Sequence, residues 1–96
     1  MYKLLIVEDD FIIAKGLQKH FEKYHYDVQY IEDFEHVLDD FLEFQPDLVL
    51  LDIHLPFFDG YYWCQEIRKI SQVPIVFISS ANENMNIVLA MNMGGY

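Results

Sequence analysis

The sequence predicts an α/β domain in which a parallel sheet is covered by helices on both faces. Three short apolar runs, 3–7, 48–51 and 75–78, have the length and continuity of strands that are buried on both sides. A segment with helical spacing of apolar residues follows each run, so that strands and helices alternate along the chain. Its 96 residues, 53% of them apolar, suffice for one domain with a core.

The first strand and helix are predicted around an acidic junction. The run 3–7 ends in Glu8-Asp9-Asp10, and Asp9 or Asp10 can cap the helix that follows. The inner face of that helix is predicted to consist of Ile13, Leu17, Phe21 and Tyr24. The opposite face is predicted to carry Lys15, Lys19 and Lys23.

The next two elements are an edge strand and a second helix. Residues 26–31 alternate between apolar and polar, which is typical of a half-exposed strand. Asp33 is expected to cap the second helix. Its inner stripe is predicted to be Phe34, Val37, Leu38, Phe41 and Leu42.

The second half repeats the alternation. Pro46 separates the second helix from the strand 48–51, which ends at Asp52, and residues 53–59 form a loop. Asp59 can cap a third helix whose inner face is Trp63, Ile67 and Ile70. Pro74 opens the strand 75–78, which ends in Ser79-Ser80. A last helix is predicted over about 84–93, stopped by Gly94-Gly95.

Composition and charge exclude several classes of protein. The net charge is −10, and the 44 residues between Lys23 and Arg68 contain 11 of the 16 acids but no lysine or arginine. A basic face for nucleic acid is therefore missing, so direct contact with DNA by this domain is not expected. The single Cys64 excludes a disulfide framework, and no apolar run is long enough to span a membrane. A cytoplasmic location is expected.

Polar residues follow three of the predicted strands. In an open α/β sheet, ligands bind beyond the carboxyl ends of the strands, so Glu8 or Asp9 should face Asp52, with Ser79 nearby. Clustered carboxylates repel one another unless a cation lies between them, and all-oxygen ligands suit Mg²⁺. Each aspartate alone could be a helix cap or turn residue. The coincidence of acidic or hydroxyl groups at three strand ends favours a site where an aspartate attacks a phosphoryl group beside a metal.

These residues resemble a known family. The stretches Leu4–Asp10, Pro46–Asp52 with Leu55-Pro56 and Asp59-Gly60, and Val73–Ser79 resemble the receiver domain of bacterial two-component response regulators over the whole chain. The resemblance implies a flavodoxin-like, three-layer fold with sheet order 2-1-3-4-5, an order for which a receiver protein is a known example. It is closest to regulators with a winged-helix DNA-binding domain, and within these to the subgroup that responds to antimicrobial peptides.

The resemblance also implies roles for individual residues. Asp52 is the phosphoacceptor for a sensor histidine kinase, and Mg²⁺ is bound by Glu8, Asp9, Asp52 and the backbone carbonyl of His54. Ser79 is the hydroxyl that moves onto the phosphoryl group, and Ser80 occupies the position that governs access to it. The protein is then no ordinary enzyme: in its longer parent it catalyses its own phosphotransfer and dephosphorylation, and a separate DNA-binding domain controls transcription.

The chain also departs from the family pattern. The fifth strand, the lysine at its end and the fifth helix are missing, so we expect residues 1–96 to be a receiver domain that is incomplete at its C-terminus, with four of the usual five βα units. The strand 75–78 should then have an open edge, through which a homodimer or a strand-exchanged assembly could form.

Two other functions remain open at this stage. One is a receiver-like docking module that is not phosphorylated, because the lysine is missing. The other is a phosphatase with an aspartate nucleophile. Such an enzyme would require a second aspartate two residues after the first, where this chain has His54.

Overall fold

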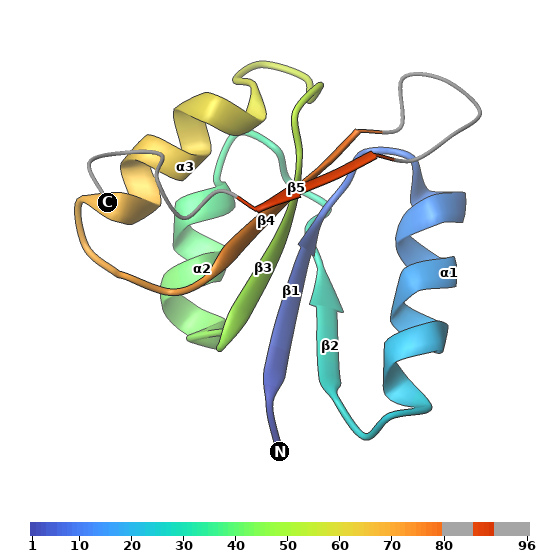
Figure 1. The fold of residues 1–96 in the computed structure, drawn as a ribbon. Coiled ribbons are helices and arrows are strands. Elements are labelled where there is room, and N and C mark those ends of the chain that lie inside the picture. Colours follow the sequence, from blue (N-terminus) through green and yellow to red (C-terminus); the bar gives the residue numbers. More distant parts are fainter. Residues whose placement is uncertain (80–85, 90–96) are drawn as a thin grey trace.

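A computed structural model describes residues 1–79 and 86–89 and shows three layers (Figure 1). The central layer is a sheet of β1 (Lys3–Val7), β2 (Asp27–Tyr30), β3 (Leu48–Asp52), β4 (Ile75–Ser79) and β5 (Asn86–Leu89). Helix α1 (Phe11–Glu22) covers one face, and α2 (Val37–Phe44) and α3 (Gly60–Arg68) cover the other. The predicted fold class is confirmed.

The sheet has the order β2-β1-β3-β4-β5, and its first four strands are parallel. The strand β1 pairs with β2 on one side and with β3 on the other, so the chain crosses over after its second strand. This crossover places the carboxyl ends of β1 and β3 next to each other, where ligands bind in open α/β sheets.

The sheet separates two apolar cores. Successive side chains of a strand point to opposite faces, so Leu4 and Ile6 of β1 pack under α1, while Leu5 and Val7 pack under α2 and α3. All four side chains are essentially inaccessible to solvent. Such a strand, apolar at every position after Lys3, is what the sequence predicted.

The helices are shorter than the apolar periodicity suggested. Tyr24 follows the end of α1 and is 64% exposed, and Ile70 follows the end of α3 and is 52% exposed. Leu42 lies within α2 but is also 52% exposed. The assignment of these three residues to inner faces was therefore wrong. Among the lysines, Lys15, Lys19 and Lys23 are exposed as predicted.

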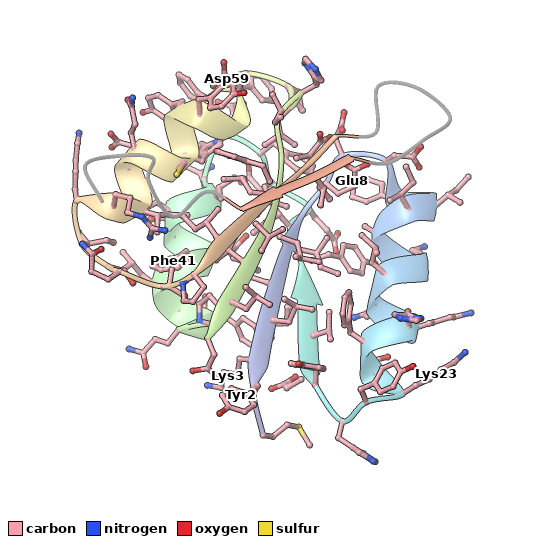
Figure 2. The ribbon with its side chains drawn as sticks, in the orientation of Figure 1. Tyr2, Lys3, Glu8, Lys23, Phe41 and Asp59 are labelled. Carbon is pink, nitrogen blue, oxygen red and sulfur yellow. The ribbon has the colours of Figure 1, made fainter. Side chains whose placement is uncertain are left out.

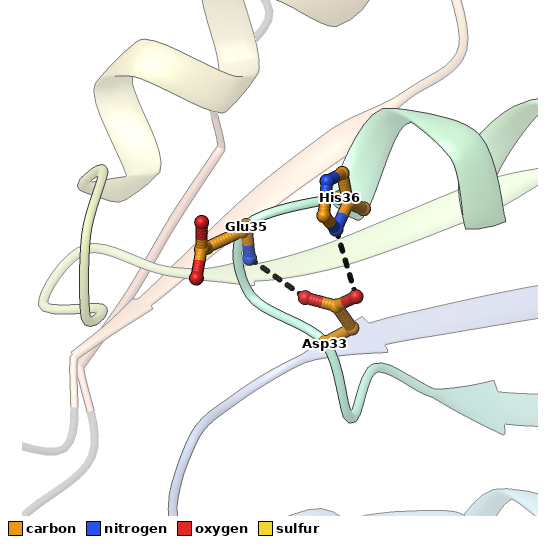
Figure 3. Close-up of polar contacts among 3 residues, drawn as sticks. All are labelled: Asp33, Glu35 and His36. Carbon is orange, nitrogen blue, oxygen red and sulfur yellow. Dashed lines mark hydrogen bonds and ion pairs between the residues drawn. The ribbon is translucent and has the colours of Figure 1, made fainter.

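The turn between β2 and α2 also differs from its prediction. Asp33 does not cap the helix, which begins four residues later at Val37. Its carboxylate instead accepts hydrogen bonds from the backbone N–H of Glu35 at 3.1 Å and from Nδ1 of His36 at 2.8 Å (Figure 3). This local turn competes with the helix for the same backbone groups, which is the usual behaviour of aspartate.

We expect the ion pair between Asp33 and His36 to give a small, pH-dependent stabilisation. The hydrogen bond that His36 donates to Asp33, and the negative charge of Asp33, raise the pKa of His36. The stabilisation is then fully present below the ordinary histidine pKa and is lost as the pH rises through the raised value. Both side chains are exposed, so the effect is slight. Urea unfolding at about pH 5.5 and about pH 8.5 should show a smaller pH dependence in His36→Gln. An equal pH dependence of the free energy of unfolding in wild type and His36→Gln would contradict this prediction.

A strand replaces the last predicted helix. Residues Asn86–Leu89, which were assigned to a helix over about 84–93, form β5 and pair with β4 in antiparallel orientation. The remainder of that predicted helix lies outside the described residues. The expected open edge of β4 is therefore wrong. A strand edge presents unpaired N–H and C=O groups, and a segment containing Ile87 and Val88 has the β-branched residues that favour strand pairing.

Within the part of the chain that the structure describes, no helix is long and apolar enough to cross a membrane.

Candidate functional site: a carboxylate cluster at the ends of β1 and β3

Three carboxylates meet where β1 and β3 end. Val7 lies opposite Leu51 in the parallel register, so the next residues, Glu8 and Asp52, lie at the same level where the two strands end. Figure 2 shows Glu8 at this end of the sheet, far from Lys3 at the other end. Glu8, Asp9 and Asp52 each provide a carboxylate oxygen, and these oxygens lie within 4.8 Å of one another. The predicted meeting of these residues is therefore observed.

The cluster is partly removed from water. Glu8 is 0% and Asp52 is 1% exposed, whereas Asp9 lies on the solvent side. Desolvation raises the pKa of Asp9, and the nearby charges of Asp52 and Asp10 raise it further. Carboxylate oxygens held this close, two of them buried, form a ligand set that fits a hard divalent cation such as Mg²⁺.

Backbone groups fix the carboxylate of Asp52. Its Oδ1 accepts a hydrogen bond from the backbone N–H of His54 at 3.2 Å. The N–H of Ile53 donates to the carbonyl oxygen of Ile78 at 3.2 Å, which continues the link from β3 to β4 beyond Asp52. The side chain of His54 is exposed, as the sequence predicted for a loop histidine. These two hydrogen bonds hold the start of the loop after β3 against the carboxylate of Asp52 and against the end of β4.

The first residue of α3 touches the backbone of Asp52. The N–H of Gly60 donates to the carbonyl oxygen of Ile53 at 2.9 Å. A Cβ atom at position 60 would lie 2.3 Å from the carbonyl oxygen of Asp52, so only glycine fits. The sequence marked Asp59-Gly60 as a turn but gave no indication of this contact. The predicted cap is confirmed, because Asp59 accepts a hydrogen bond from the N–H of Tyr62 at 2.9 Å.

The two serines are only partly covered by the structure. Ser79 is the last residue of β4. It lies one position beyond Ile78, which pairs with Asp52. Ser79 therefore leaves the sheet at the same end as the carboxylates. Ser80 lies outside the described residues. The roles expected for both hydroxyls remain predictions.

Comparison with known proteins identifies the family. Residues 4–96 match the family model of the response regulator receiver domain. The chain belongs to this family. Receiver domains take part in two-component signalling, so the coarse functional prediction from the sequence is confirmed.

Two curated relatives illustrate the relationship. The chain is 52% identical over 95 residues to the uncharacterized transcriptional regulatory protein YvcP of Bacillus subtilis, with 99% of this chain and 40% of the relative covered. It is 44% identical over 92 residues to the response regulator protein GraR of Staphylococcus aureus, with 96% and 41% covered. The chain thus spans about two fifths of these relatives, whose names describe regulators rather than enzymes.

Solved structures agree with the fold. The N-terminal domain of the nisin resistance regulator NsrR, a lantibiotic response regulator, is 46% identical, with a TM-score of 0.81 over 100% of this chain and 81% of that one. The BeF3-activated receiver domain of Klebsiella pneumoniae RstA is 34% identical, with a TM-score of 0.78 over 83% of this chain and 68% of that one. Both are N-terminal domains of regulators, and the RstA domain is described as a receiver domain.

Proposed function

We propose that Asp52 accepts a phosphoryl group from the phosphohistidine of a sensor histidine kinase. The observation that supports this role is the position of Asp52: a buried carboxylate at the end of a central strand, within 4.8 Å of two other carboxylates. A carboxylate oxygen of Asp52 forms a bond to phosphorus while the phosphorus–nitrogen bond to the imidazole breaks. The imidazole leaves with the electron pair of that bond, and the product is an acyl phosphate on Asp52.

The other acids have a different role in this proposal. Glu8, Asp9, Asp52 and the backbone carbonyl of His54 would hold Mg²⁺, which supplies positive charge against the phosphoryl oxygens when it is bound. Its positive charge would also reduce the mutual repulsion of the three carboxylates. The hydrogen bond from the N–H of His54 orients the carboxylate of Asp52.

The hydroxyl of Ser79 is proposed to bind the phosphoryl group, and Ser80 to govern access to it. The support is the register of the sheet, since Ser79 follows the residue that pairs with Asp52. A hydroxyl at this strand end can donate a hydrogen bond to a phosphoryl oxygen, and that bond exists only after phosphorylation. The hydroxyl could thereby couple the chemistry at Asp52 to the end of β4.

The chain is proposed to act as the receiver domain of a transcription regulator. Its match to the N-terminal domain of NsrR, a lantibiotic response regulator, supports this role. The name of YvcP supports transcription control, and that of NsrR, a nisin resistance regulator, supports membership of the subgroup that responds to antimicrobial peptides. A separate winged-helix DNA-binding domain is part of the same proposal. Homodimer formation also remains a proposal.

The outer face of α1 is the proposed docking surface for the kinase. Ile12 is 85% exposed although it is apolar, and the exposed Lys15 and Lys19 follow at positions three and seven residues further along the helix. An apolar side chain beside lysines can contact a partner helix that carries acids. Kinase-driven phosphorylation should therefore be slower in Ile12→Ser.

The proposed chemistry is tested by incubating the chain with a small phosphodonor and MgCl₂, followed by intact-mass and peptide mass spectrometry. One phosphoryl group is expected, on Asp52, stable in acid and labile in base. Asp52→Asn should not be labelled. The matched control is Asp39→Asn, an exposed acid of α2, which should be labelled like the wild type. Labelling of another residue would refute the assignment. If the phosphodonor leaves the chain unlabelled and the chain nevertheless binds a histidine kinase, it is a docking module that is not phosphorylated.

A further inference from the structure

Four aromatic side chains are exposed around the start of α3. They belong to the loop after β3 and to the first turn of the helix, on either side of Asp59 in the sequence, and Figure 2 labels Asp59. The exposed fractions are 70% for Phe57, 42% for Phe58, 42% for Tyr61 and 38% for Tyr62. We call these four residues the aromatic patch. The sequence did not predict this cluster, which is a finding of the structure. Clustered exposed apolar groups are typical of interaction sites.

The aromatic patch is held in place from below. The rings of Phe58 and Tyr62 stack with centroids 4.3 Å apart and an interplanar angle of 19°. Both rings contact the buried Trp63 edge to face, at 5.6 Å and 4.9 Å. Tyr61 is fixed in the same way against Phe77 of β4, at 5.1 Å. Side chains that are already ordered lose little entropy when a partner binds, which favours affinity.

Phe57 gains little from its position in the free protein. Its φ of 68° lies in the left-handed region, which is strained for a bulky side chain. This strain is of the order of 1–3 kcal/mol, and glycine would avoid it. At 70% exposure, the ring also recovers little of this energy by burial. Contact with another molecule that covers the ring would explain why a strained and exposed aromatic residue occupies this position.

The charges around the aromatic patch select its partner. The patch lies within the segment between Lys23 and Arg68 that contains no lysine or arginine. The nearest bases in the chain are not available, since Arg68 is buried and Lys69 pairs with Glu66 at 2.7 Å. Asp59, in the middle of the patch, is exposed. A second copy of this chain, with its own charge of −10, would be repelled, as would an anionic lipid surface.

We propose that the aromatic patch binds a cationic, amphipathic helix of a partner protein. Apolar side chains of that helix would cover Phe57 and Phe58, and its lysine or arginine side chains would lie over the rings of Tyr61 and Tyr62, where a cation is attracted to the π face. The acids of the chain would increase the rate of association at low salt. The site is separate from the outer face of α1 proposed for the kinase, and it does not require phosphorylation of Asp52.

The test uses a synthetic helix of about 18 residues, long enough for five turns, with leucine on one face and lysine on the other. Trp63 is the only tryptophan and contacts two members of the patch, so its fluorescence should change on binding. Calorimetry then measures affinities. A peptide with glutamate in place of lysine should bind at least about tenfold more weakly. Tyr62→Ser should also reduce affinity about tenfold or more. Tyr24→Ser, which removes an exposed aromatic side chain just after the end of α1, is the matched control and should bind normally.

Phe57→Gly separates binding from folding. It should raise the melting temperature, because the backbone strain is relieved, and at the same time reduce affinity for the cationic helix. A more stable variant that binds less well cannot be explained by misfolding. Equal affinity of Phe57→Gly and wild type, or a loss of affinity in Tyr24→Ser equal to that in Tyr62→Ser, would overturn the proposal. So would concentration-dependent dimers in analytical ultracentrifugation that disappear in Tyr62→Ser, since the occupant would then be a second copy.

Discussion

Gly60→Ala is expected to destabilise the domain by about 2–3 kcal/mol, which is typical of inserting a methyl group where the backbone cannot yield. The added Cβ would lie 2.3 Å from the carbonyl oxygen of Asp52 and 3.0 Å from its carbonyl carbon. Either α3 must move away from β3 or the backbone of Asp52 must shift. The free energy of unfolding, from urea titration followed by circular dichroism, measures the loss. Labelling of Asp52 by the phosphodonor should fall as well.

Gly16→Ala is the matched control, and the expected sign is opposite. Gly16 lies in the interior of α1, and a Cβ at that position would meet nothing within 4 Å. Because alanine restricts the unfolded chain and favours the helix, this variant should be more stable than wild type by about 0.5–1 kcal/mol. Equal effects of the two substitutions would show that helix propensity, rather than the contact with Asp52, decides the outcome at position 60.

The second large effect is expected from Asp52→Asn in the absence of metal. Two unit charges 4.8 Å apart repel by about 3.5 kcal/mol at an effective dielectric constant of 20. Removing the charge of Asp52 should therefore stabilise the metal-free domain, by about 1–3 kcal/mol once solvent screening is allowed for. Asparagine keeps the oxygen that accepts the N–H of His54, so the loop stays anchored.

The same variant should lose its response to Mg²⁺. The wild type should melt at a higher temperature when MgCl₂ is added, because a ligand that binds only the folded state stabilises it. Asp52→Asn and Asp9→Asn should reduce this rise, and Asp39→Asn, away from the cluster, should retain it. Equal rises in wild type, Asp52→Asn and Asp9→Asn would place the cation elsewhere.

The pH dependence of Asp9→Asn provides an independent test. Desolvation and the neighbouring charges raise the pKa of Asp9, so the folded state binds this proton more tightly than the unfolded state does. Ionised Asp9 therefore destabilises the metal-free domain at neutral pH, and this penalty disappears as the pH falls through the raised pKa. Asp9→Asn should be more stable than wild type at pH 7, and the two should converge in acid.

The strands and the carboxylate cluster could be predicted because they depend on local patterns. Short, uninterrupted apolar runs form buried strands. A polar residue directly after such a run lies at the end of the sheet where that strand stops. The positions of Asp52 and Glu8 follow from this pattern alone. The caps at Asp10 and Asp59 were also predictable, since aspartate before a helix accepts the free N–H groups of its first turn.

Other features depend on contacts that periodicity does not contain. The stripe assigned to the third helix continued to Ile70, but the helix ends at Arg68, which is buried and donates through Nη1 to the carbonyl oxygen of Val73 at 2.7 Å. Asn86–Leu89 adopts a strand because the edge of β4 is available, which is a tertiary effect. The close approach of Gly60 to Asp52 likewise joins two elements, and a turn motif does not reveal it.

The register of β1 against β3 must be specified by something other than apolar burial. Leu4, Leu5, Ile6 and Val7 are all aliphatic and all buried, so a shift of this strand by one residue would simply exchange the side chains between two apolar cores. Apolar burial alone therefore discriminates poorly between registers. A shift by one residue would, however, move Glu8 out of level with Asp52 and leave an aliphatic side chain or Asp9 in its place. The acids proposed to bind the metal would then also mark the correct alignment of the central strand, so that the folding of this sheet and its chemistry depend on the same few side chains.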